Sequence, residues 1–520
     1  MNAIQYPTGF RKWIIVITVV TASLLEMIDT TVVNVSLTQI MGNLGATLED
    51  VAWVITSYAV ANVIILPMTG WLSSKFGRKN YFVFSILLFT LASFFCGNAH
   101  SIWELVIFRF IQGIGGGALL STSQSILFET FKPEDRGMAT AIFGLGVVLG
   151  PTFGPTIGGF ITDHYSWPWI FYINLPLGII AALLSLTFIT ESIDRRVIDR
   201  VDWLGIGLLI AGIGALQIVL ERGQTEDWFD ATYIVILTIV SVLSLLLFVW
   251  RELSIDHPVV DFRIMKDRSF SFGLVFSFIL GFGLFASVFV FPIFCQGLLG
   301  FTAQQTGELM IPSGLITIII MPLVGTLLKK KVPPQFMAVV GFAIFYFFTK
   351  VLSSSTLASG ESDFYWPLLL RGIGMGCLFV PLTAMGLSGL KGKDMAQGVG
   401  LNNMIRQLGG SFGVALMTTF IHTRLSVHRI NLLNHINVYD PATQERLNGF
   451  TAAFMGRGMY PAQAQQMAVA ALEGTIGKQT ALMSYMDAFW IIGIFFLCCI
   501  PLILFQRHSR NAVVSMEGVH

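Results

Sequence analysis

The sequence predicts an all-α integral membrane protein, in which two pseudo-symmetric six-helix halves and two inserted helices give fourteen transmembrane helices. Three observations predict this architecture: an apolar composition, a series of apolar segments of membrane-spanning length, and an internal repeat. Of the 520 residues, 54% are hydrophobic and 12% are charged, and the mean hydropathy is +0.74. Soluble domains carry roughly 25% charged residues, so lipid is the expected solvent. The net charge of +1 gives no basic footprint, so no nucleic-acid partner is expected.

Apolar segments of about 20 residues define the predicted spans, because a chain in lipid must satisfy its backbone hydrogen bonds as a helix. Most of the 31 lysine and arginine residues fall in segments that this count places in the cytoplasm, whereas the short outer loops hold only Arg222. The positive-inside rule therefore predicts a multi-pass protein of the cell inner membrane with both termini in the cytoplasm. The predicted spans are 13–41, 51–72, 81–97, 101–127, 137–162, 169–190, 203–222, 231–250, 270–297, 305–328, 336–352, 364–388, 395–421 and 484–506.

An internal repeat divides the chain into two halves. Three local matches occur in the same order and at similar offsets, so spans 9–14 repeat spans 1–6, and spans 7 and 8 are inserted between them. The matched pairs are 66–72 with 321–327, 149–154 with 408–413, and Arg109 with Arg371. The predicted units are an N-terminal half at 1–200, the inserted helices and linker at 201–268, and a C-terminal half at 269–520 with a long outer loop at 422–483.

Three charged residues within the predicted spans are candidates for proton coupling. Glu26 and Asp29 lie one helical turn apart on span 1, and Arg109 lies on span 4. A rise of about 1.5 Å per residue places Asp29 and Arg109 at similar depths. A buried arginine is costly in lipid and needs a partner or a watery cavity, so an ion pair of these two residues is predicted. Burial and a nearby cation act on the proton affinity of a carboxyl in opposite directions, so the pair could titrate. A purely structural ion pair is the alternative.

Two glycine-rich motifs are candidates for conformational change. The first, at 70–79, forms the turn between spans 2 and 3, where glycines permit a tight turn and cations can hold neighbouring helix ends; topological charge alone is the alternative. The second, at 144–159, has glycines every three or four residues, which leave a bare helix face for close packing, and two prolines that set a bend; generic small-residue packing is the alternative. The candidate residues are Gly70, Gly77, Arg78 and Lys79 in the first motif, and Gly150, Pro151, Gly154, Pro155, Gly158 and Gly159 in the second.

Together these motifs resemble those of the major facilitator superfamily, which holds substrate between two six-helix halves. The turn at 70–79 resembles its signature loop, although Ser74 stands where the family usually has aspartate. The 144–159 segment resembles the antiporter motif that is found chiefly in exporters. With 29–34 and 167–178, the chain resembles the EmrB/QacA type of fourteen-helix drug:proton antiporter over nearly its whole length, although Pro168 stands where arginine is common.

This resemblance implies a secondary active multidrug exporter, not an enzyme, that is driven by the proton gradient without a cofactor. The expected partners are H⁺, amphiphilic or cationic toxic compounds and membrane lipid. The long segment 422–483 resembles the EmrB branch, which implies a periplasmic adaptor and an outer-membrane channel of the TolC type. An exporter or importer of a specific metabolite or fatty acid is the alternative function.

Residues expected near a substrate cavity are polar or aromatic and lie within the spans. Abundant phenylalanines on span 9 suit planar or cationic ligands, although packing against helices or lipid is the alternative for most of them. The cavity candidates are Glu26, Asp29, Asn34, Tyr58, Gln112, Phe285, Phe289 and Arg371.

Segment 422–483 contains a stretch of helix formers, Gln463 to Leu472. An amphipathic helix against the membrane surface or a partner, and a solvated connector, both fit its sequence.

Two other classes of function are disfavoured. An ATP-driven pump would need a phosphate-binding loop, and the glycines and lysine at 474–479 have the wrong spacing for one. An embedded enzyme would need a nucleophile with its base or a set of metal ligands, and the spans show neither pattern, so no metal site is expected.

Overall fold

The computed structural model describes residues 6–505 except for 192–200, 257, 391–392 and 438. The described chain is helical throughout, with no strand among these residues. The predicted boundary at residue 200 lies outside them. The longer helices are α1 (Gly9–Leu44), α2 (Leu48–Phe76), α3 (Arg78–Gly97), α4 (Ile102–Thr130), α5 (Arg136–His164), α6 (Trp169–Tyr172), α7 (Asn174–Phe188), α8 (Trp203–Arg222), α9 (Thr232–Ser254), α10 (Arg268–Ile293), α11 (Ala303–Lys329), α12 (Pro334–Leu352), α13 (Ser362–Leu387), α14 (Lys393–Leu433), α15 (Pro441–Met455) and α16 (Pro461–Phe505). Short helical turns lie at Pro133–Asp135, Trp228–Asp230, Phe262–Lys266 and Phe294–Leu298.

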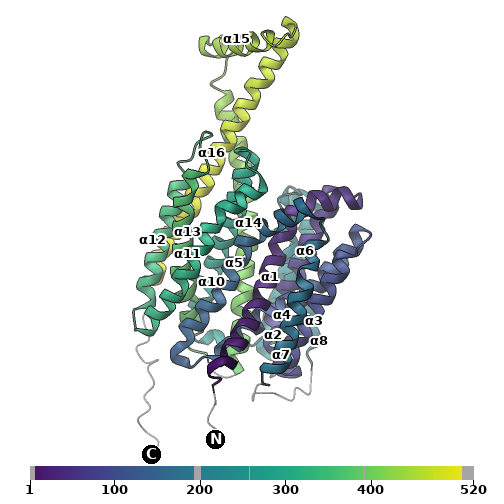
Figure 1. The fold of residues 1–520 in the computed structure, drawn as a ribbon, viewed down its shortest axis with the longest axis vertical. Coiled ribbons are helices and arrows are strands. Elements are labelled where there is room, and N and C mark those ends of the chain that lie inside the picture. The colour runs from purple at the N-terminus through teal and green to yellow at the C-terminus, as the bar shows by residue number, and fades with distance from the viewer. Residues whose placement is uncertain (1–5, 192–200, 257, 391–392, 438, 506–520) are drawn as a thin grey trace, which may run out of the picture.

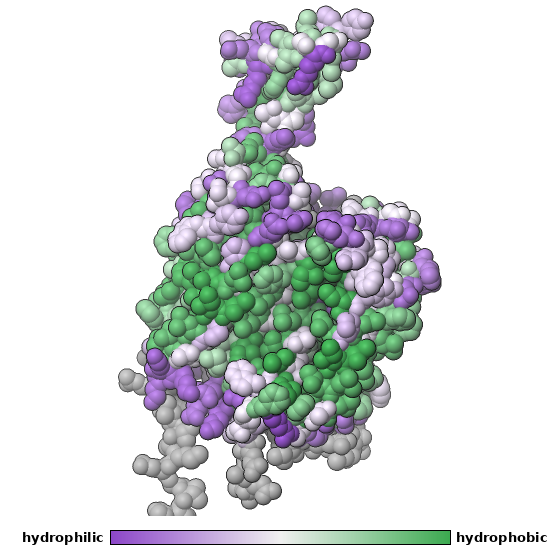
Figure 2. Space-filling view, viewed as in Figure 1, coloured by the Kyte–Doolittle hydropathy of each residue, from purple (hydrophilic) through white to green (hydrophobic). Residues whose placement is uncertain are grey.

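Thirteen helical segments of the described chain are long and apolar enough to cross a membrane, with α6 and α7 forming one of them. The predicted span 395–421 falls in α14, which misses this criterion because it carries polar side chains such as Asn402, Asn403 and Arg406. α14 nevertheless lies inside the bundle, where it contacts α10, α2 and α16. The predicted count of fourteen therefore agrees with the structure. Figure 2 shows an apolar band across the visible face of the bundle, with hydrophilic residues toward both ends of this face.

The two halves repeat the same helix pairing. In the first half α1 packs on α5, α2 on α4, and α3 on α4 and α7; in the second α10 packs on α14, α11 on α13, and α12 on α13 and α16. These are the pairs that the sequence repeat predicts. The exact residue limits of the two units stay a prediction.

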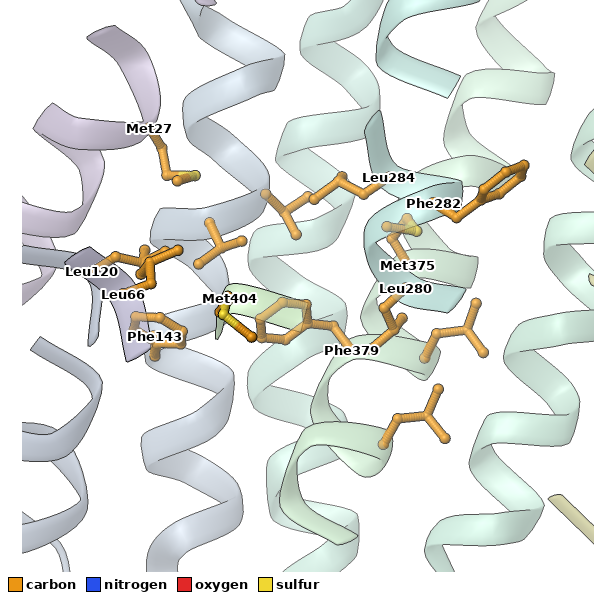
Figure 3. Close-up of a cluster of buried hydrophobic side chains, with 14 of the residues drawn as sticks. Met27, Leu66, Leu120, Phe143, Leu280, Phe282, Leu284, Met375, Phe379 and Met404 are labelled. Atoms are coloured by element: carbon orange, nitrogen blue, oxygen red, sulfur yellow. The ribbon is translucent and has the colours of Figure 1, made fainter. Parts of the chain in front are cut away.

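The halves meet along two seams, α5 with α11 and α2 with α14. Glycines make both seams close near the end of the bundle where α1 begins and α16 ends, here called the termini end (Figure 1). A Cβ atom added at Gly70 would lie 2.8 Å from the backbone of Gln397, and one at Gly325 would lie 3.0 Å from the carbonyl oxygen of Gly137. Apolar side chains from both halves fill the space between the seams (Figure 3).

The inserted helices α8 and α9 pack on each other, and α8 alone contacts both halves, at α2 and α14. Gln217 donates to the Ser411 hydroxyl at 2.8 Å, and Arg222 donates to the Glu49 carbonyl at 3.2 Å. Most of α9 is exposed, as expected for a helix that faces lipid.

The described residues of segment 422–483 are helical almost throughout, and the placement of this segment on the outer side stays a prediction. α14 and α16 run on past the predicted span limits, side by side, and α15 folds back on α16 to form a projection, here called the distal hairpin (residues 422–483; Figure 1). Asp440 caps α15 by accepting from the Thr443 amide at 3.1 Å. In Figure 2 the hairpin stands away from the apolar band.

Candidate functional site

Asp29 is the centre of a buried polar cluster formed by α1, α4 and α7. One carboxylate oxygen forms an ion pair with Arg109 Nη1. The other accepts from Gln112 Nε2 and from Asn174 Nδ2, both at 2.9 Å. Asp29 and Arg109 are 0% and 1% exposed. The carboxylate is therefore held by three donors in a region without water access, where removing one partner of an ion pair costs about 3–5 kcal/mol.

Arg109 is fixed by further contacts on its other side. Its Nε donates to the carbonyl oxygen of Val54 at 3.3 Å, and Nη1 also donates to Gln112 Oε1 at 2.7 Å. The Tyr58 ring lies 4.0 Å from the guanidinium carbon, a cation–π contact. These contacts hold a planar group in one orientation, which an ammonium could not reproduce.

Glycines on α4 bring the partners within reach. A Cβ atom at Gly113 would lie 2.5 Å from the Tyr58 carbonyl oxygen, and one at Gly116 would lie 3.2 Å from Glu26 Cγ. Larger side chains would separate α4 from α1 and α2. The close approach of these helices thus depends on the R-F-I-Q-G stretch and the glycines that follow it.

Glu26 lies one turn from Asp29 and is also buried, but it belongs to a different hydrogen-bond set. Asn62 Nδ2 donates to one of its carboxylate oxygens at 2.8 Å. The other oxygen, Oε2, has no hydrogen-bond partner among the described residues. Glu26 is therefore the less satisfied of the two buried carboxyl groups.

A polar bridge crosses from α14 to α4 between the halves. Asn403 Nδ2 donates to the Ser121 hydroxyl at 3.2 Å and to Gln124 Oε1 at 3.0 Å. Arg406 donates to the side-chain oxygen of Asn403. The sequence analysis did not single out Asn403, because an uncharged polar residue on a polar helix has no distinguishing pattern.

Arg371 lies in the C-terminal half at the repeat position of Arg109, apart from the Asp29 cluster. Its Nε donates to the Ser287 hydroxyl on α10 and its Nη1 to the Ser313 hydroxyl on α11, both at 3.2 Å. No acidic side chain bonds to it in the described part of the chain.

The 70–79 motif ties α3 to neighbouring helices. Gly77 has a φ of +87°, a conformation that favours glycine. Arg78 forms an ion pair with Glu129 at the end of α4, and Lys79 Nζ donates to the Leu186 carbonyl at 2.6 Å. Ser74 bonds only within its own helix, to the Gly70 carbonyl at 2.9 Å. The motif is therefore tied to α4 by the Arg78–Glu129 pair. Glu129 lies just after the predicted span 101–127 and was not foreseen.

The 144–159 motif packs α5 against α1. A Cβ atom at Gly150 would lie 2.2 Å from Met27 Cβ, one at Gly154 would lie 1.9 Å from Thr31 Oγ1, and one at Gly158 would lie 2.6 Å from Val35 Cγ2. Pro151, Pro155 and the buried Gly159 lie within the same helix. The glycine face of α5 therefore packs directly against α1, the helix that carries Glu26 and Asp29.

The structure brings some cavity candidates together and separates others. Tyr58 and Gln112 join Glu26, Asp29 and Arg109 in or beside one cluster. Asn34 is exposed and Phe289 is only partly buried, while Phe285 packs on α14 at Gly410. Asn62 and Asn174, which bond to the two carboxylates, were missed as site residues, although Asn174 stands in a motif that the sequence analysis quoted.

Helices in two repeated sets of six, with a buried acid–base pair in one set and a polar bridge between the sets, define a polytopic secondary transporter. The family model described as Major Facilitator Superfamily matches residues 19–414. The chain belongs to this superfamily.

Several characterised transporters are similar to the chain over nearly all of its length. The multidrug export protein EmrB of Escherichia coli strain K12 is 33% identical over 98% of both chains, and EmrB of Haemophilus influenzae is 35% identical over 94% of both. The fatty acid resistance protein FarB of Neisseria gonorrhoeae is 32% identical over 93% of both. The chain is thus a transporter of the EmrB type.

Among solved structures, the human organic anion transporter MFSD10 (TETRAN) superposes with a TM-score of 0.55. The superposition covers 93% of this chain and 99% of the MFSD10 chain, at 14% sequence identity. At this identity the likeness supports the fold alone.

Proposed function

We propose that this protein exports amphiphilic, chiefly cationic, toxic compounds across the cell inner membrane in exchange for protons. The observation that carries the proposal is the buried Asp29–Arg109 ion pair beside the second carboxyl group of Glu26. A membrane-embedded ionisable pair is by default a functional hypothesis, and the names of the EmrB relatives specify multidrug export.

Asp29 is the proposed proton-binding group. Protonation would neutralise the carboxylate and leave the guanidinium of Arg109 without its counter-ion, held only by Gln112, Val54 and Tyr58. An unpaired buried charge is unfavourable, so protonation would favour a conformation in which Arg109 reaches water. Because α1 is packed along the glycines of α5, a change at Asp29 can be transmitted as a rigid movement of these two helices.

Glu26 is the proposed recognition point for cationic substrates, since one of its oxygens has no partner in the described structure. In this proposal the termini end faces the cytoplasm and the distal hairpin the periplasm, as the positive-inside count predicts.

The proposal is tested with inverted membrane vesicles and an imposed pH gradient. Ethidium should accumulate in the vesicles when the lumen is acidic, and the gradient should dissipate faster as ethidium moves. A Na⁺ gradient in place of the pH gradient should have no effect. Accumulation that is independent of the pH gradient would rule out proton antiport.

The distal hairpin is the proposed docking element for a periplasmic adaptor, which would pass substrate to a TolC-type outer-membrane channel. The hairpin projects well beyond the apolar band and exposes apolar side chains such as Met467 and Val469, at 43% and 56%. Helical pairing with a partner buries such residues.

Replacing residues 434–470 with a short Gly-Ser linker tests this role. The change removes α15 and the start of α16, including Met467 and Val469, but keeps the Arg429–Glu473 and Arg424–Asp487 pairs below it. Vesicle transport should persist while resistance of whole cells is lost. A cysteine at exposed Gln466 should cross-link the adaptor, whereas a cysteine at buried Ala464 should not. Whole-cell resistance that survives the replacement would exclude the three-part assembly.

Export of a fatty acid is a second candidate function, which the similarity to FarB favours. The same vesicles distinguish the two functions when decanoate replaces ethidium as the transported compound.

A further inference from the structure

Arg406 is a second buried cation in the central region, and no acidic side chain of the described residues bonds to it. It lies on α14 and is 3% exposed. Its Nη2 donates to Asn403, but Nη1 has no partner within the described residues. A buried guanidinium is costly unless an anion pairs with it, and its five donors are suited to a carboxylate.

Aromatic rings from both halves surround this cation. The guanidinium carbon lies 5.1 Å from the Phe379 ring of α13 and 5.8 Å from the Phe143 ring of α5. The two rings are 6.4 Å apart, and Met404 lies near both in Figure 3. A charged group beside aromatic and thioether side chains matches the two parts of an amphiphile, a polar head and an apolar chain.

Glu26 lies on the other half and complements Arg406. The two charges are close enough to interact, yet neither group is saturated: Glu26 Oε2 and Arg406 Nη1 both lack partners in the part of the chain that the structure describes. The central region therefore has a negative pole on α1 and a positive pole on α14.

A structural role for Arg406 is the competing explanation. Its bond to Asn403 orients the amide that bridges to Ser121 and Gln124. If this were its whole function, its removal would affect transport of every substrate to the same extent, whatever the charge of the substrate.

We propose that Arg406 binds the carboxylate of anionic amphiphiles, while Phe143 and Phe379 hold the apolar chain. This inference rests on the proposed export function, because it specifies a substrate class for the same central region. It gives the transporter two charge-specific recognition points, Glu26 for cations and Arg406 for carboxylates.

Binding of radiolabelled decanoate and of ethidium to the purified full-length protein tests the proposal. R406Q should lower the decanoate-to-ethidium ratio of affinities about tenfold or more, the loss expected for a charged hydrogen-bonded contact. R406K should lower it less, because an ammonium keeps the charge but not the fork of donors. E26Q should change the ratio in the opposite direction.

R371Q is the matched control. Arg371 is equally buried and also has one nitrogen, Nη2, without a partner among the described residues. It differs from Arg406 because it bonds to serines of its own half and has no cation–π contact in that part of the chain. R371Q should leave the ratio of affinities unchanged. The thermal midpoint of each variant identifies loss of folding. If R406Q is unstable, the proposal is tested by whether R406K lowers the decanoate-to-ethidium ratio of affinities.

Two results would overturn the proposal: no decanoate binding by the unaltered protein, or an equal loss of both ligands in the Arg406 variants. Transport in liposomes separates this inference from the function on which it rests. Charge-selective binding without gradient-driven transport would remove the proposed antiport and leave the carboxylate site standing.

Discussion

The two halves place a buried arginine at the same repeat position but surround it differently. Arg109 on α4 meets the carboxylate of Asp29 on α1, whereas Arg371 on α13 meets the hydroxyls of Ser287 on α10 and Ser313 on α11. Because α10 repeats α1, Ser287 takes the place in the second half that Asp29 has in the first. One half thus contains a buried acid–base pair, and the other contains a buried cation whose hydrogen bonds go to neutral hydroxyl groups.

This difference suggests a division of tasks within one duplicated fold. A hydroxyl stabilises a guanidinium by hydrogen bonding but gains no charge when the pH changes. A carboxylate can form such hydrogen bonds and can also change its charge with pH. We therefore propose that proton coupling resides in the first half, and expect changes at Asp29 to affect transport far more than equivalent changes at Ser287.

Asp29→Asn should have the largest effect. Asparagine keeps the shape and can still accept from Gln112 or Asn174, but it cannot bind a proton and leaves Arg109 uncompensated. Gradient-driven ethidium transport in vesicles should fall to background. The protein should still insert, with a lowered thermal midpoint, since an unpaired buried charge costs about 3–5 kcal/mol.

A double variant separates stability from coupling. Asp29→Asn with Arg109→Gln removes both charges, so the thermal midpoint should recover much of the loss while transport stays at background. Proton-coupled efflux in either variant would remove Asp29 from the mechanism, and the two arginine sites would then differ in structure only.

Arg109→Lys should have an intermediate effect. A lysine keeps the charge opposite Asp29, but it loses the simultaneous contacts to Val54, Gln112 and the Tyr58 ring. We expect Arg109→Lys to lower the transport rate about tenfold, equivalent to about 1.4 kcal/mol. Arg109→Ala should lose transport as completely as Asp29→Asn. Initial rates at matched protein amounts measure both. Full activity of the lysine variant would mean that charge alone is required.

Arg371→Lys is the matched change in the second half. Its two serine contacts are weaker than an ion pair, so the loss in transport rate should be smaller than that of Arg109→Lys. Equal losses would show that the two sites contribute alike, against the division proposed above.

Much of the fold could be predicted from the sequence because lipid imposes a strong rule. Apolar segments of fixed length had to be helices, and the matched stretches 66–72 with 321–327 and 149–154 with 408–413 indicated the pairing order of the halves. The distal hairpin could not be recognised in the same way. Residues 463–472 favoured a helix, but its direction is set by contacts distant in sequence, such as the Arg429–Glu473 pair.

The candidate site was predicted only in part, for a similar reason. Charged residues stand out in apolar spans, so Glu26, Asp29 and Arg109 could be named and their depths compared. Asn62, Asn403 and Glu129 are ordinary polar residues whose role depends on the helix that faces them. Phe285 was predicted to line a cavity but packs against Gly410. The sequence does not indicate whether an aromatic side chain in a span faces a cavity or a neighbouring helix.

Ser287→Asp should have the smallest effect and tests the comparison most directly, because it rebuilds the first half's pair in the second. The Ser287 hydroxyl already accepts from Arg371 Nε at 3.2 Å, so a carboxylate one bond longer can reach the guanidinium. Pairing a buried cation that lacks a counter-ion should raise the free energy of unfolding at neutral pH by an amount on the order of 1–3 kcal/mol. The thermal midpoint should rise accordingly. Ser287→Asn, with the same shape and no charge, should not raise the thermal midpoint.

Transport of ethidium should change little in either variant, because Asp29 would still be the coupling group. A second proton per cycle in Ser287→Asp would show that a carboxylate beside the repeated arginine suffices for coupling. A lower midpoint than in Ser287→Asn would show that the second half excludes an acid from this position.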